Sequence, residues 1–85
     1  MTTLETEKAE LALKMAEAEK QGQWKILAEL ALHGEALDPE WFVAAAYYQA
    51  ATIELVGEQF CQYSIVREAV AANRRVRALA DKLGP

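Results

Sequence analysis

Alanine constrains the fold of this chain more than any other residue type. It occupies 17 of the 85 positions, whereas glycine occupies four and proline two. Alanine leads the helix-propensity scale, and glycine and proline stand at its other end. The sequence therefore predicts an all-α protein. A chain of this length is sufficient for a single domain, which we expect to span residues 1–85.

The composition also excludes several classes of protein. Cys61 is the only cysteine, which excludes a disulfide scaffold. The longest uncharged run, Trp41–Ile53, has 13 residues, whereas a helix needs about 20 to cross a bilayer. The acidic residues among the first ten positions are not typical of a signal peptide. We therefore expect a cytoplasmic protein with no membrane segment.

Hydrophobic periodicity predicts four helices, which cover residues 3–21, 23–33, 39–56 and 58–83. Gly22 and Gly57 are expected to end the first and third of them. A loop is predicted over residues 34–38. Asp38 and Pro39 are expected to start the third helix, as its N-cap and its first residue.

The third and fourth helices have distinct predicted roles. The third is apolar nearly all round, so we expect it to be central. The fourth is either one long helix or two helices broken near Asn73. It carries a heptad seam of Ile65, Ala69, Ala72, Val76, Leu79 and Leu83. The expected architecture is two antiparallel helical hairpins, arranged as a four-helix bundle or a stack, with a long C-terminal helix.

An internal repeat suggests how the hairpins are related. Gly22 and Gly57 are 35 residues apart, which aligns two helix–turn–helix units. In the first unit Lys20-Gln21-Gly22 is followed by Trp24 and then by Leu37-Asp38-Pro39. This pattern resembles the tetratricopeptide repeat. The helix lengths and the alanine-rich central helix are also similar to the three-helix microtubule-interacting-and-transport bundle.

The tetratricopeptide resemblance covers residues 8–74 and implies a concave face that binds an extended peptide or a helix. The residues implied for this face come from the first and third helices. They are Ala9, Ala12, Ala16, Glu19, Lys20, Ala44, Tyr47, Ala51 and Glu54.

Aromatic residues give a second indication of a binding surface. The core is predicted to take Trp24, Tyr48 and Phe60, but the adjacent pairs Trp41-Phe42 and Tyr47-Tyr48 point about 100° apart on a helix. One member of each pair therefore reaches a second layer or faces outward, and exposed aromatics are enriched at interfaces. We predict a small helical interaction module that self-associates and binds a peptide or helix. The predicted partner-binding residues are Trp41, Phe42, Tyr47, Ala51, Glu54, Arg74 and Arg77.

Uneven charge leaves two alternatives open. Residues 1–57 carry ten acidic and four basic side chains, whereas residues 58–85 carry three acidic and five basic ones. A nucleic-acid or regulatory binder would use the basic residues Arg67, Arg74, Arg75, Arg77 and Lys82. The net charge of −4 disfavours nucleic acid as the ligand. The other alternative is a small acidic inhibitor of a larger complex.

The sequence contains no pattern that predicts catalysis. His33 is the only histidine, and with Glu29 it would supply only two metal ligands. Cys61 has no histidine near it in sequence to form a catalytic pair. Glycine-rich phosphate loops and nucleophile motifs are absent. We expect no enzymatic activity, and no bound cofactor or metal.

Overall fold

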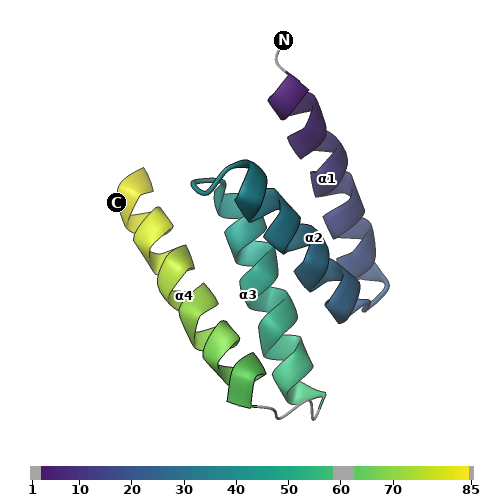
Figure 1. The fold of residues 1–85 in the computed structure, drawn as a ribbon, viewed down its shortest axis with the longest axis vertical. Coiled ribbons are helices and arrows are strands. Elements are labelled where there is room, and N and C mark those ends of the chain that lie inside the picture. Colours follow the sequence, from purple (N-terminus) through teal and green to yellow (C-terminus); the bar gives the residue numbers. More distant parts are fainter. Residues whose placement is uncertain (1–2, 59–62, 85) are drawn as a thin grey trace.

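The computed structural model describes residues 3–58 and 63–84, and within these ranges the chain forms four helices and no strand. The helices are α1 (Thr3–Lys20), α2 (Trp24–Leu37), α3 (Phe42–Gly57) and α4 (Tyr63–Leu83). The all-α prediction is confirmed. Helix α1 pairs with α2, and α3 pairs with α4, each time in antiparallel orientation (Figure 1).

The helices lie in chain order across the molecule (Figure 1). Helix α3 packs against both α2 and α4, as predicted for a helix that is apolar nearly all round. Helix α1 packs mainly against α2 and touches α3 less. Helices α1 and α4 make no contact in the described ranges and form the two opposite edges of the molecule. Among the described helices, none has the length and apolar character needed to cross a bilayer.

The hydrophobic core lies chiefly between α1, α2 and α3. Met15 and Leu27 are its largest fully buried apolar side chains. Of the predicted core aromatics, Tyr48 is buried, Trp24 packs at the edge, and Phe60 lies outside the described residues. The buried cluster consists of Leu11, Met15, Ala18, Leu27, Ala31, Tyr48, Ala51 and Ala72.

Helix α4 is continuous through Asn73, so the alternative of two shorter helices is excluded. Its predicted seam faces α3: Ala72 is buried and four other seam residues are partly buried. Leu83, the last seam residue, is 74% exposed, so the seam is not buried at the C-terminal end of α4.

The predicted loop over residues 34–38 is wrong, because α2 continues through Gly34 to Leu37. Glycine usually weakens the interior of a helix. Here it allows close packing, since a Cβ atom on Gly34 would lie 2.9 Å from the Cβ of Ala44 and 3.0 Å from Cζ3 of Trp41. Contact with α3 therefore outweighs the local preference of glycine for a turn.

The predicted start of the third helix is also wrong. Asp38 and Pro39 precede α3, and Trp41 is its N-cap residue. Asp38 instead follows the end of α2, where its N–H donates to the carbonyl of Gly34 at 3.0 Å. Its carboxylate accepts the N–H of Glu40 at 3.0 Å. This local aspartate turn competes with the N-cap geometry that the sequence suggested.

Lys8 attaches α1 to the same turn. Its Nζ atom donates to Oδ2 of Asp38 at 2.8 Å and lies 5.1 Å from the ring centroid of Trp41. The hydrogen bond from Lys8, followed by that from the N–H of Glu40, lowers the pKa of the Asp38 carboxyl below its usual range. Trp41 is therefore half-buried between the core and a lysine from another helix.

Candidate functional site

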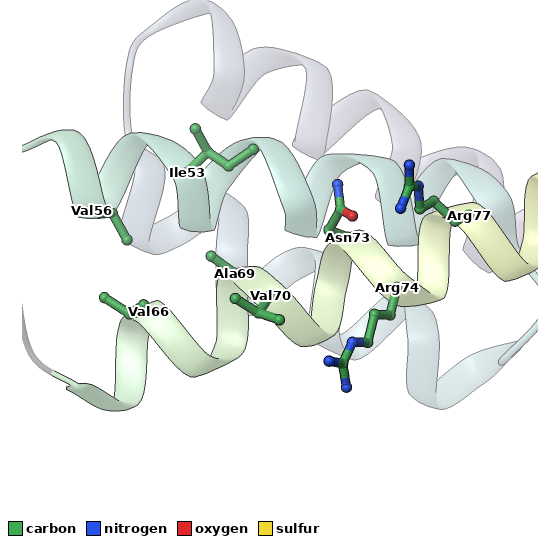
Figure 2. A pocket seen from close by; sticks show the side chains of 8 residues that line it. All are labelled: Ile53, Val56, Val66, Ala69, Val70, Asn73, Arg74 and Arg77. Carbon is green, nitrogen blue, oxygen red and sulfur yellow. The ribbon is translucent and has the colours of Figure 1, made fainter.

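An apolar groove runs between α3 and α4 on the surface of the molecule, with a volume of about 410 Å³ (Figure 2). Helix α3 contributes two side chains and α4 contributes six. Its lining residues are Ile53, Val56, Val66, Ala69, Val70, Asn73, Arg74 and Arg77.

The apolar residues of the groove are unusually exposed for their type. Ile53, Val66 and Val70 are 53%, 41% and 49% exposed. Val66 and Val70 lie one turn apart on α4, next to the heptad seam but outside it. Neither α1 nor α2 contributes a residue to the groove lining, and the fold leaves this apolar surface open to solvent.

One end of the groove is basic. Figure 2 shows Val56 and Val66 at one end, whereas Asn73, Arg74 and Arg77 lie toward the other. No carboxylate of the described residues forms an ion pair with Arg74 or Arg77. The groove therefore combines an apolar surface with two guanidinium groups that no acid of the described chain neutralises.

Two other cations of α4 are used within the fold. Nε of Arg75 lies 2.9 Å from Oε2 of Glu35 on α2, although its N–H does not point along this contact. The hydrogen bond in this pair is donated by Nη2 of Arg75 to Oε1 of Glu35, at 3.3 Å. Lys82 donates to the carboxylate of Glu40 at 2.8 Å. The five basic residues thus do not form one uniform basic face.

Tyr48 of α3 makes side-chain contacts with two residues of α4. Its hydroxyl donates to Oε2 of Glu68 at 2.9 Å, and the guanidinium of Arg75 lies 5.4 Å from its ring centroid. Burial first, and then the hydrogen bond to Glu68, raise the pKa of Tyr48 to about 12. This set of contacts ties α3 to α4 and fixes one wall of the groove relative to the other.

We predict that Tyr48 makes the fold sensitive to alkali. In the unfolded chain this phenol ionises near pH 10, before the folded one does, so its contribution to stability is complete below about pH 10. That contribution is lost as the pH rises from about 10 to about 12. Tyr48→Phe should lower the free energy of unfolding at pH 7 by about 1 kcal/mol. Its deficit relative to the wild type should shrink above pH 10, as measured by denaturant titration followed by circular dichroism. Parallel pH profiles for the two proteins would contradict the assignment.

The predicted partner-binding residues occupy several places. Arg74 and Arg77 line the groove, and Glu54 is exposed on α3. Ala51 is fully buried in the core, where no partner can reach it. Trp41 lies beneath Lys8, as described above. The sequence analysis did not predict Ile53, Val66 and Val70 as binding residues. Val66 and Val70 lie four residues apart and outside the heptad seam, and this spacing could have indicated a second apolar face on α4.

Two predicted aromatics line a second, smaller groove. Phe42 and Tyr47 are half-buried and face Glu19 of α1 across a space of about 330 Å³. Glu19 and Tyr47 are two of the residues that the tetratricopeptide resemblance implied for a shared face. The structure therefore brings these two together.

The described ranges contain no group of side chains that is arranged as a metal site. No three histidine, cysteine, aspartate or glutamate side chains there are grouped as metal ligands. His33 is exposed between α1 and α2, and Cys61 lies outside the described residues.

No protein-family profile, curated protein or solved structure matches this chain.

Proposed function

We propose that this protein is a helical protein–protein interaction module, and that its α3–α4 groove binds one face of an amphipathic helix. The observation that carries the proposal is the open apolar surface of Ile53, Val66 and Val70 beside two guanidinium groups without acidic partners. Amphipathic helices bind such grooves through apolar residues spaced three or four apart.

The chemistry of the groove favours an acidic partner. Apolar side chains entering between Val66 and Ile53 would remove exposed hydrocarbon from water. Carboxylates toward one end of the partner would meet Arg74 and Arg77, whose planar guanidinium groups bind carboxylates in a bidentate manner. A groove of this size implies a small interface, so we expect a dissociation constant in the micromolar range.

A stack of the tetratricopeptide type is the architecture that we propose for the two hairpins. In its support, a glycine lies near the end of the first helix of each hairpin: Gly22 is in the turn two residues after α1, and Gly57 is the last residue of α3. The groove of Phe42 and Tyr47 beside α1 is then a second contact surface.

Nucleic acid is a weaker candidate ligand. Two of the five basic residues of α4, Arg75 and Lys82, are paired with carboxylates of the chain itself. Arg74 and Arg77 share the groove with the exposed side chains of Val66 and Val70. Phosphate binding by many cations, which gives steep salt dependence, has less support here than binding of an acidic helix.

The proposal is tested with a fluorescein-labelled peptide of about 18 alanine, leucine and glutamate residues, with leucines along one helical face. We expect fluorescence anisotropy to show micromolar binding that weakens with salt. Val70→Ser should weaken binding about tenfold, because it removes apolar contact at the centre of the groove. The matched control is Leu32→Ser on α2, where a side chain of similar exposure (47%) lies away from the groove. Equal effects of the two substitutions, or no binding to the wild type, would contradict the proposal.

A further inference from the structure

The outer face of α1 has the properties that the groove requires of a partner. Leu13 is 74% exposed, and Ala9 and Ala16 lie on the same side, four residues before it and three after it. Glu10 and Glu17 lie along one edge of this stripe. The stripe is opposite the buried face of α1, so nothing within the described fold covers it.

From these complementary surfaces we propose that the α3–α4 groove of one molecule binds α1 of a second copy of the chain. Leu13 would enter the groove between Ile53 and Val70. The small side chains of Ala9 and Ala16 would let the two helices approach closely. This inference rests on the proposed function, because it names the helix that the groove takes.

Charge complementarity favours α1 of a second copy as the helix that binds in the groove. The α1 stripe presents Glu10, which forms no ion pair among the described residues, and Glu17, which accepts a hydrogen bond from Gln21 at 2.6 Å. The groove presents Arg74 and Arg77. The groove lining contains no carboxylate, so a symmetric contact between two grooves would leave Arg74 and Arg77 without acidic partners. The two complementary surfaces therefore favour a contact of unlike faces.

The positions of α1 and α4 determine the kind of assembly. They are the two opposite edges of the molecule and do not touch each other (Figure 1). A molecule that accepts α1 of one neighbour can still offer its own α1 to the next. Such head-to-tail contacts produce rings or open chains rather than a closed dimer.

Complementation between two variants tests the inference. The first variant, Leu13→Glu, blocks the α1 stripe but keeps the groove intact. The second, Arg74→Glu with Arg77→Glu, blocks the groove but keeps α1 intact. All three positions are exposed, so the substitutions leave the core unchanged. Masses are measured by light scattering and sedimentation from about 1 to about 1,000 µM, the range for a small interface.

We expect the mass of the wild-type protein to rise with concentration beyond that of a dimer. Each variant alone should remain monomeric, with its self-affinity reduced at least tenfold. An equimolar mixture should form a complex of one copy of each variant and nothing larger, because only one intact groove and one intact α1 stripe are present. Formation of that complex also shows that both variants are folded.

Three results would overturn the inference: a monomeric wild type throughout the range, self-association of either variant at wild-type strength, or no complex in the mixture. The peptide assay separates this failure from failure of the proposed function. If the peptide binds at Val70 while the wild type stays monomeric, the groove binds an acidic helix other than α1. If the peptide and the mixture both fail to bind, the proposed function is wrong as well.

Discussion

Leu27→Ala should destabilise the protein by about 2–5 kcal/mol, which is the range expected for truncating a fully buried leucine. Leu27 has no exposed surface and lies at the centre of the cluster formed by α1, α2 and α3. Its truncation removes buried hydrocarbon and leaves a cavity that helices on three sides cannot fully close. A domain of this size has a total stability of about 4–13 kcal/mol, so the variant loses a large part of it.

Urea denaturation followed by circular dichroism measures this loss. The matched control is Leu32→Ala, which makes the same chemical change five residues later in the same helix, at a side chain that is 47% exposed. We expect the control to cost less than about 1 kcal/mol, because little buried surface is lost and alanine has a high helix propensity. Similar costs for the two variants would mean that the core is not centred on Leu27.

Gly34→Ala should destabilise the protein by about 1–3 kcal/mol, although glycine to alanine inside a helix is ordinarily stabilising. The added Cβ would lie 2.9 Å from the Cβ of Ala44, which cannot rotate away. The ring of Trp41, at 3.0 Å, is the next obstacle. Helices α2 and α3 would have to move apart, which loosens the contacts on both sides of Gly34.

Gly57→Ala is the control, since a Cβ atom there meets nothing within 4 Å. It should be neutral or stabilising by up to about 1 kcal/mol. In a double-mutant cycle, Ala44→Gly should recover part of the loss caused by Gly34→Ala, because it removes the atom that the new methyl group meets. The cycle compares the melting temperatures of the wild type, the two single variants Gly34→Ala and Ala44→Gly, and the double variant. Stabilisation by Gly34→Ala would contradict the close approach of α2 and α3.

Periodicity in the sequence was sufficient to predict the helices but not the junction between the hairpins. Leu11, Met15 and Ala18 follow the helical spacing of α1 and are buried as that spacing requires. Gly34 and the Asp38-Pro39 pair have strong local preferences, and both were read as helix boundaries. Their actual positions depend on a neighbour that is distant in sequence or on an aspartate that binds its own backbone.

The candidate site was predicted in part for a similar reason. Arg74 and Arg77 could be identified from charge alone, and both line the groove. The exposure of Val66 and Val70 depends on α1 and α2 lying on the far side of α3, which a single sequence does not reveal. Ala51 was placed on a surface by resemblance, but α3 has neighbours on more than one side and buries it.

The chain-order layout of the helices has a consequence for how quickly the protein folds. Each helix packs mainly on the one that precedes or follows it in the chain. The polypeptide therefore closes only short loops to form most of its native contacts, and the entropy lost before those contacts form is small. Helical proteins with such local topology fold within microseconds to milliseconds. A chain that leaves valines and a leucine open to solvent thus spends little time with its core exposed as well.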